Sequence, residues 1–329
     1  MVEHMTRRLL LLQLLGWMVL CAATVHWFHQ PWPVAALGSS VTLLAARMAI
    51  TINSFVLAWR YRSDTPAAHR LNAAQMTRLF FVEFASSLWS SSWAMPFQCF
   101  SDGEVAPGNG LPVLLVHGYG CNSGYWHAMH QAMTRAGIGH HAIDLEPVFG
   151  DIEEYVPLVQ RAVDDLCRSC GQDRVIIVAH SMGGLAARAY LRLHGSTKIA
   201  RLITIGTPHH GTAIANFGVG MNCRQMHGRA TKDHGQHVPS LWLRKLDEGE
   251  DIATRTSIVS IYSHHDNIVA PQTSAHLDGA RNIAFEGIGH VTLALHPRIH
   301  ACVIAEICAV SAQGAPEKLA TREPLALQA

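Results

Sequence analysis

One short segment constrains the fold of this chain more than any other: an apolar strand that runs directly into a helix, with a serine at the junction. The strand is predicted over 174–179 and the helix over 182–193, with Ser181 between them. A turn this tight brings the residues two before and two after the serine together, so both must be small. Ala179 and Gly183 meet that requirement. The pattern predicts a nucleophilic serine on a sharp turn, and a serine N-cap that opens an ordinary helix is the plainer alternative.

Further short apolar runs recur on both sides of this segment and alternate with amphipathic stretches. Apolar strands separated by helices are typical of a parallel sheet covered on both faces. We therefore expect an α/β domain over 104–310 and a disordered tail over 311–329. A weakly periodic insertion at about 213–256 carries Met and aromatic residues, and it is either a cap or lid or a packed helical excursion. The predicted strands are 113–116, 141–143, 174–179, 202–205, 258–262 and 282–285.

A serine hydroxyl becomes a good nucleophile only when a base removes its proton and a carboxylate orients that base. Asp266 and His290 each follow a predicted strand downstream of Ser181, on loops at the same edge of the sheet. Their order along the chain, serine then acid then histidine, is the one that this strand-to-helix arrangement uses. Other groups stay open as alternatives, namely His264, His265, His296 and His300 for the base and Asp278 and Glu286 for the acid.

The negative charge that develops on an attacked carbonyl oxygen needs hydrogen-bond donors, each worth about 10²–10³ in rate. The backbone N–H of Met182, directly after the serine, is one candidate donor. The glycine-rich turn after strand 113–116 supplies the second, and we expect it to be the N–H of Tyr119. A plain strand-ending turn is the alternative interpretation of that segment.

Five parts of the chain carry a family resemblance: His117-Gly118-Tyr119-Gly120, Ala179-His180-Ser181-Met182-Gly183-Gly184, Gly206-Thr207-Pro208-His209-His210-Gly211-Thr212, Asp266 and Gly289-His290. Together they resemble bacterial lipases and carboxylesterases of the α/β-hydrolase superfamily, over residues of about 110–306. The resemblance implies an α/β-hydrolase fold, serine ester hydrolase activity, and a Ser181, Asp266 and His290 triad. It also implies oxyanion donors at Tyr119 and Met182, and a pocket lined by His117, Gly118, His180, Pro208 and His209.

The first 78 residues are predicted to anchor the chain in a membrane through two transmembrane helices, at about 9–28 and 34–59. A helix over 9–28 rises about 30 Å, the thickness of a bilayer core. A cleaved signal peptide is the alternative for this first run. The second run carries Arg47 in its middle, which is costly in lipid unless the charge is paired or reaches the surface.

The segment 79–103 is predicted to form either an aromatic helix at the membrane interface or a third span, followed by a linker. Its apolar stretch, 79–97, contains Glu83 and several serines among the aromatic residues. The basic residues of 60–78 favour the cytoplasmic side for that segment. A third span would place the downstream domain on the opposite side. We expect a bacterial inner-membrane protein, with the side of the catalytic domain left open.

Charge and histidine spacing exclude other function classes. The formal net charge of +1, from 25 basic and 24 acidic residues, offers no electrostatic surface for nucleic acid. The 22 histidines show none of the spacings of a metal site, so no metal and no cofactor are expected. The leading hypothesis is a membrane-anchored serine hydrolase of carboxylic esters, with small-molecule or lipid esters as substrate. An acyltransferase with the same triad and a non-catalytic lipid- or partner-binding protein are the alternatives, and the oligomeric state stays open.

Overall fold

A parallel sheet forms the core of the molecule, which is described by a computed structural model over residues 1–101, 105–106, 108–230 and 237–313. Six strands lie in the order β2-β1-β3-β4-β7-β8, and every neighbouring pair is parallel. All six predicted strands are confirmed, and the sheet confirms the expected α/β fold class. The strands are β1 (Asn109–Val116), β2 (Ile138–Ile143), β3 (Val175–His180), β4 (Ile199–Ile205), β7 (Ile258–Ser263) and β8 (Arg281–Phe285).

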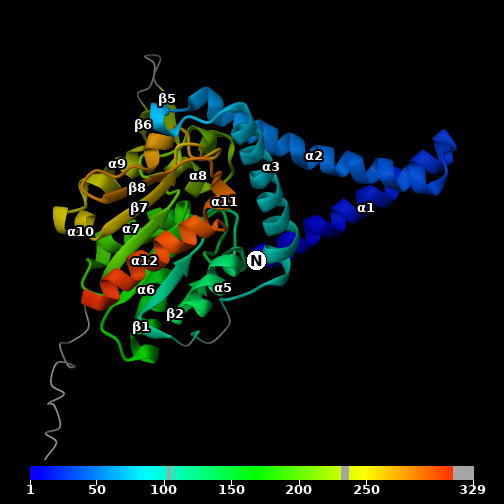
Figure 1. Cartoon of the computed structure of the whole chain (residues 1–329). Helices are drawn as coiled ribbons and strands as arrows, with labels where there is room; N and C mark the ends of the chain where they lie inside the picture. The colour runs from blue at the N-terminus through cyan, green and yellow to red at the C-terminus, as the bar shows by residue number, and fades with distance from the viewer. Residues whose placement is uncertain (102–104, 107, 231–236, 314–329) are drawn as a thin grey trace, which may run out of the picture.

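Helices cover both faces of this sheet (Figure 1). Side chains of a strand alternate between the faces, so Leu114 and Val116 of β1 join one core while Val113 and Leu115 join the other. The first core is closed by α6 (Val156–Cys170), α7 (Met182–His194) and α9 (Leu241–Glu248). The second is closed by α5 (His127–Arg135), α11 (His290–Leu293) and α12 (Pro297–Gln313).

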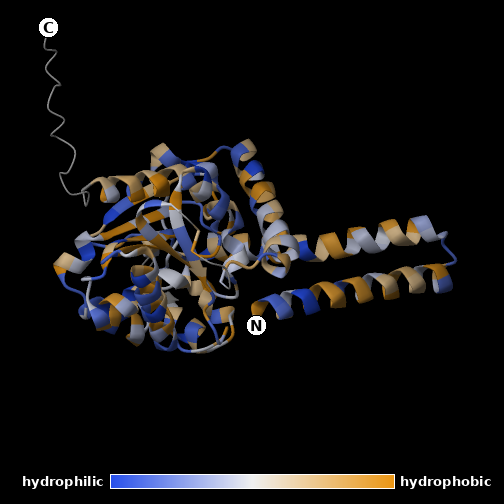
Figure 2. Cartoon of the chain, turned by 90° about the horizontal axis from the view of Figure 1, so that it is seen from below, coloured by the Kyte–Doolittle hydropathy of each residue, from blue (hydrophilic) through white to orange (hydrophobic). Residues whose placement is uncertain are grey.

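Two long helices, α1 (Val2–Phe28) and α2 (Trp32–Tyr61), form a hairpin that projects from the domain (Figures 1 and 2). Both are long and apolar enough to cross a membrane, by length and composition. None of the most apolar stretch of α1 is buried and only 11% of that of α2. The charge of Arg47 is hydrogen-bonded to neutral groups, with its Nη2 2.6 Å from Gln13 Oε1 and its Nη1 2.9 Å from Ser91 Oγ.

A third helix, α3 (Ala73–Trp89), runs between the hairpin and the α/β domain, against α11 (Figure 1). It continues through a wider π-helical turn, η2 (Ser90–Ala94), into the short α4 (Met95–Phe97). One face of α3 buries Leu79 and Glu83 against the domain, while Phe81 on another face is about half exposed. From the sequence, 79–97 could be a third membrane span or an interfacial helix. In the structure, this segment lies alongside the α/β domain.

The remaining elements connect these layers. The predicted insertion contains η5 (Ala213–Phe217), α8 (Met221–Met226), the hairpin β5 (Gly228–Ala230) with β6 (His237–Pro239), α9, and α10 (Ile252–Thr256). Helix α12 continues to Gln313, and the rest of the predicted tail, 314–329, lies outside the described residues, as do 102–104, 107 and 231–236. Single turns of helix are η1 (Ala67–His69), η3 (Ser123–Trp126), η4 (Ile152–Tyr155) and η6 (Gln272–Ala275).

Candidate active site

Ser181 occupies the junction between β3 and α7 in a strained backbone conformation. Its φ of +53° and ψ of −126° lie in a backbone region that residues other than glycine rarely adopt. The serine side chain makes no capping hydrogen bond to the helix, in contrast to the plainer N-cap interpretation. A Cβ added at Gly183 would lie 2.4 Å from the His117 carbonyl oxygen, so α7 starts directly against β1. Small residues around the serine therefore follow from backbone packing.

The side chains of Ser181, His290 and Asp266 form one hydrogen-bonded chain. His290 Nε2 lies 3.0 Å from Ser181 Oγ, and His290 Nδ1 lies 2.8 Å from Asp266 Oδ2. The second carboxylate oxygen of Asp266 accepts the backbone N–H groups of Ile268 and Val269, at 2.8 and 2.7 Å. All three triad side chains are more than 90% buried. The carboxylate is thus held from one side while it orients the imidazole from the other.

The surroundings of His290 favour its protonated form. Burial alone would lower the pKa of this imidazole, but the negative charge of Asp266, its hydrogen bond and the charge of Glu83 outweigh burial and raise it. A raised pKa makes the imidazole a stronger base toward the serine proton. The arrangement is chemically suited to nucleophilic attack by Ser181.

The other groups that the sequence left open make different contacts. The His264 ring lies 4.6 Å from that of His69, and His265 accepts the N–H of Gly287. His300 donates to the carbonyl of Ala294, and the His296 Nδ1 accepts the N–H of Arg298. Glu286 pairs with His69 and Arg298, and Asp278 pairs with His276. Within the described part of the chain, His290 is the histidine hydrogen-bonded to Ser181.

The turn that carries Tyr119 passes directly over the serine. A Cβ added at Gly118 would lie 2.9 Å from the Ser181 Cβ, which leaves room only for glycine there. Met182 is the first residue of α7, so its N–H has no carbonyl partner one turn earlier in the helix. Both predicted oxyanion donors thus belong to backbone beside Ser181, and their donation to an oxyanion stays a prediction. The Tyr119 hydroxyl is fixed at 2.9 Å from the carbonyl of Val219 in the insertion.

The residues predicted to line a pocket are buried and hydrogen-bonded within the protein. His117 Nε2 accepts the N–H of Leu145, and His180 Nε2 lies 3.1 Å from the His290 carbonyl oxygen. His209 is enclosed by Thr204, Ser260 and Arg188. Burial and the charge of Arg188 lower the pKa of His209, so this ring is neutral. These histidines brace the backbone around the triad, while Gly118 and Pro208 are packed in the adjoining turns, and contact with substrate stays a prediction for all five.

The insertion divides into two parts with different environments. Leu243 and Leu246 of α9 are buried in the core beside α7, and the Trp242 indole donates to Glu153. Between η5 and α8, by contrast, Phe217 and Val219 are more than 60% exposed close to the Tyr119 turn. The α9 part is therefore a packed helical excursion, and the η5–α8 part is the portion that contacts Tyr119.

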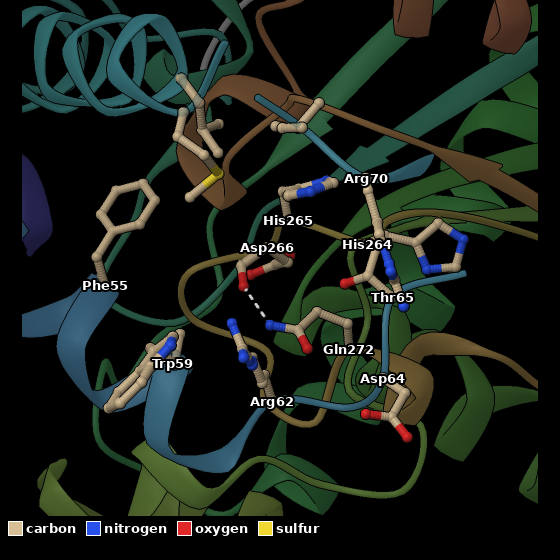
Figure 3. A pocket seen from close by; sticks show the side chains of 14 residues that line it. Phe55, Trp59, Arg62, Asp64, Thr65, Arg70, His264, His265, Asp266 and Gln272 are labelled. Atoms are coloured by element: carbon tan, nitrogen blue, oxygen red, sulfur yellow. Dashed lines mark hydrogen bonds between the residues drawn. The ribbon is translucent and has the colours of Figure 1, made fainter. Parts of the chain in front are cut away.

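A cavity of about 450 Å³ lies behind the triad acid, between α2, α3 and the loop after β7 (Figure 3). In Figure 3 the Gln272 side chain reaches the Asp266 backbone, with Nε2 2.8 Å from the carbonyl oxygen. Helices α2 and α3 supply the apolar wall, and the facing wall is polar. The apolar lining includes Phe55, Ala58, Trp59, Met76 and Leu79, and the polar lining includes Arg62, Asp64, Arg70, His264 and His265. The N-terminal helices thus border the triad loop directly.

Two residues beside the triad were not predicted from the sequence to belong to the site. Asn267 Oδ1 accepts the N–H of His290 at 2.9 Å, and Glu83 accepts hydrogen bonds from the two residues that follow His290. Glu83 carried one available signal, since it is the single carboxylate in the stretch 79–97, whose other residues are apolar, aromatic or serine. Asn267 carried none beyond its place next to Asp266.

Known proteins share sequence with the part of the chain that forms this site. Residues 112–247 match the palmitoyl protein thioesterase family. The triacylglycerol lipase of Pseudomonas fragi is 29% identical over 110 residues, covering 32% of this chain and 37% of the relative. That of Burkholderia plantarii is 27% identical over 118 residues, covering 32% of each chain. The chain thus spans about a third of the length of these curated relatives.

Among solved structures, the mature form of the Bacillus licheniformis lipase BlEst2 superposes with a TM-score of 0.50 at 18% identity. The superposition covers 62% of this chain and 96% of that one, so it identifies the fold of the α/β domain. Three observations point to the same fold. They are the sequence matches, the parallel sheet, and the serine at the junction of β3 and α7. The α/β domain therefore has the α/β-hydrolase fold, and its sequence is similar to bacterial lipases and to palmitoyl protein thioesterases.

Proposed function

We propose that this protein is a membrane-anchored serine hydrolase that cleaves carboxylic esters, with lipid acyl esters as the substrate class. The observation that carries the proposal is the hydrogen-bonded chain from Ser181 Oγ through His290 to Asp266, at 3.0 and 2.8 Å. The similarity to two triacylglycerol lipases supports the ester class. The α1–α2 hairpin supports a lipid substrate, because it would hold the enzyme at the surface of its substrate pool.

The reaction proceeds through an acyl-enzyme. Ser181 Oγ attacks the ester carbonyl carbon while His290 Nε2 takes the hydroxyl proton, and the N–H groups of Met182 and Tyr119 stabilise the oxyanion. The carbon–oxygen bond to the alcohol then breaks, and the alcohol leaves with the proton from His290. Water then completes the turnover. His290 takes a proton from water while the water oxygen adds to the acyl carbon. The bond from that carbon to Ser181 Oγ breaks, the carboxylic acid leaves, and His290 returns the proton to Ser181.

Two features support retention of the N-terminal helices as an anchor. Their apolar surfaces are solvent-exposed, which a helix in the core of a soluble protein would avoid. The start of α1 is packed on the rest of the chain, with Val2 buried and Arg7 Nε 2.7 Å from the Pro96 carbonyl oxygen. A cleaved signal peptide would forfeit these contacts. Since α1 begins and α2 ends beside the domain, two spans would leave both ends of the hairpin on one side.

Thioester cleavage is a second candidate activity, favoured by the match to the palmitoyl protein thioesterase family over 112–247. The same triad can serve, because a thiolate leaves from the tetrahedral intermediate at least as readily as an alkoxide. Nothing else in the chain separates the two acyl classes, so both belong in one assay.

The test combines active-site labelling with turnover in membrane preparations of the full chain. Wild type, Ser181→Ala and His290→Ala are treated with a fluorophosphonate probe, and hydrolysis of nitrophenyl esters and acyl thioesters of increasing chain length is followed. We expect labelling and turnover in wild type only, and a labelled band that stays with membranes after an alkaline carbonate wash. Turnover retained by Ser181→Ala would refute the nucleophile, and release of the band by the wash would refute the anchor.

A further inference from the structure

Glu83 is a fully buried carboxylate that the proposed chemistry does not use. It lies on α3, in the N-terminal part of the chain, and is only 1% exposed. Its Oε1 accepts the N–H of Val291 at 2.8 Å, and its Oε2 accepts the N–H and hydroxyl of Thr292 at 3.0 and 2.6 Å. Burying a carboxylate is costly unless it is hydrogen-bonded in this way. All three donors belong to the two residues that directly follow His290.

The contact is close on the other side of the histidine as well. A Cβ added at Gly289 would lie 2.5 Å from the carboxyl carbon of Glu83, so the chain before His290 passes against the same side chain. Ser86, one helical turn after Glu83, places its hydroxyl 2.9 Å from that of Thr292. Helix α3 therefore contacts the chain immediately before and immediately after the triad histidine.

A second connection runs from α2 to the same loop. The side chain of Asn267 donates through Nδ2 to Ser54 Oγ at 2.9 Å, and its Oδ1 accepts the N–H of His290 at 2.9 Å. The carbonyls of this loop are bound from the α/β domain itself: His180 Nε2 lies 3.1 Å from the His290 oxygen, and the Tyr125 hydroxyl donates to Val291 at 2.8 Å. The backbone N–H of residue 290 thus donates to Asn267, whose side chain is bound to α2. The N–H groups of residues 291 and 292 donate to Glu83 on α3.

We propose that Glu83 is a positioning residue for His290, so that the N-terminal helices are a structural part of the active site as well as an anchor. The inference rests on the proposed function, because it assigns to Glu83 the placement of the general base of that reaction. Glu83 does not touch the reacting atoms. It holds the backbone that carries the imidazole, and an imidazole displaced by a fraction of an ångström loses its hydrogen bond to the serine.

The charge of Glu83 gives the proposal a readout that packing alone does not have. The ionisable groups that face His290 are Asp266 after β7, Glu83 on α3 and His180 at the end of β3. Burial raises the pKa of the Glu83 carboxyl itself, although the hydrogen bonds from Thr292 and Val291 oppose this. When ionised, Glu83 is among the causes that raise the pKa of His290. Loss of this negative charge therefore lowers that pKa and moves the acid limb of the pH–activity profile to lower pH.

The experiment compares Glu83→Gln with wild type in the full chain, with Thr77→Ala as the matched control. Gln keeps the size of the side chain but has no charge, and its NH₂ opposes one of the N–H donors. We expect kcat to fall about 10- to 100-fold, with KM changed less than about threefold. The acid limb of kcat should also shift to lower pH. Thr77→Ala, on the exposed side of α3, should keep wild-type kcat and pH profile.

A milder variant keeps the inference testable if Glu83→Gln does not fold. Thr292→Val removes the hydroxyl that donates to Glu83 and leaves the backbone N–H in place, so a kcat loss of several-fold in the same direction is expected. Folded Glu83→Gln or Thr292→Val protein with wild-type kcat and an unmoved acid limb overturns the positioning role. Ser181→Ala is assayed beside them: activity retained there refutes the proposed function itself, which separates the two failures.

Discussion

Gly183→Ala tests the steric argument for the serine turn most directly. The added Cβ would lie 2.4 Å from the His117 carbonyl oxygen and 2.6 Å from that of Val116, both of which are backbone atoms of the sheet or its adjoining turn. Carbon–oxygen contacts below 3.0 Å essentially never occur, so α7 and β1 must move apart by about 0.6 Å. The movement would separate the two oxyanion donors, because Met182 starts α7 and Tyr119 follows β1.

The expected cost follows from that displacement. Forcing a methyl group into a packed core destabilises by about 1–3 kcal/mol. A misplacement approaching 1 Å at a catalytic group costs about 10² in rate, and we expect a loss of that order in kcat. Both kcat and kcat/KM should fall by about the same factor, because the oxyanion donors act on the transition state.

The assay measures steady-state ester hydrolysis and thermal unfolding of the same preparations. Ala179→Gly is the matched control, because it alters the other small position of the turn without adding an atom. It should cost about 0.5–1 kcal/mol in stability through backbone entropy and keep kcat within a few-fold of wild type. Folded Gly183→Ala protein with wild-type kcat would refute the argument that backbone contact, rather than the family pattern, requires glycine at this position.

Two further predictions concern pH and stability. The acid limb of kcat/KM should be centred above the ordinary histidine value of about 6.5, because His290 acts as a base only when neutral and its pKa is raised; a profile from pH 5 to 9 measures this. Arg188→Met should lower the free energy of unfolding by about 3 kcal/mol, because the buried Glu250 carboxylate loses the Arg188 hydrogen bonds at 2.7 and 2.6 Å and keeps only a 3.4 Å contact with Arg255. Urea titration checks it, Arg168→Ala at an exposed ion pair being the neutral control within about 0.5 kcal/mol.

Much of the fold was predictable because its signals are local. Each strand of the parallel sheet is buried on both faces and so appears as a short apolar run, as in Ile176, Ile177 and Val178 of β3. The serine turn also leaves a local signal, in the small residues Ala179 and Gly183 on either side of Ser181, although the contact that requires glycine at 183 is with the backbone of Val116 and His117. The order of serine, acid and histidine along the chain, each after a predicted strand, made Asp266 and His290 the leading candidates, while several rivals stayed open at the level of sequence.

Details of the insertion were less accessible. Its Met and aromatic content was compatible with either a lid or a packed excursion. The structure shows that the α9 part is packed, and a lid role for the η5–α8 part stays a prediction. The α9 part is buried because Leu243 and Leu246 meet the core beside α7, a contact between residues some fifty positions apart. No periodicity within 213–256 distinguishes that half from the exposed residues near Val219.

The sequence by itself determined the class of the sheet, the serine turn and the identity of the triad candidates, because buried strands and a strand–serine–helix junction leave patterns that span only a few residues. Only the tertiary structure decided which side chains support the histidine. Glu83 and Thr292 lie 209 positions apart, and Ser54 and Asn267 lie 213 apart. Such contacts depend on how α2 and α3 dock on the finished domain, and docking leaves no periodic signal in either segment.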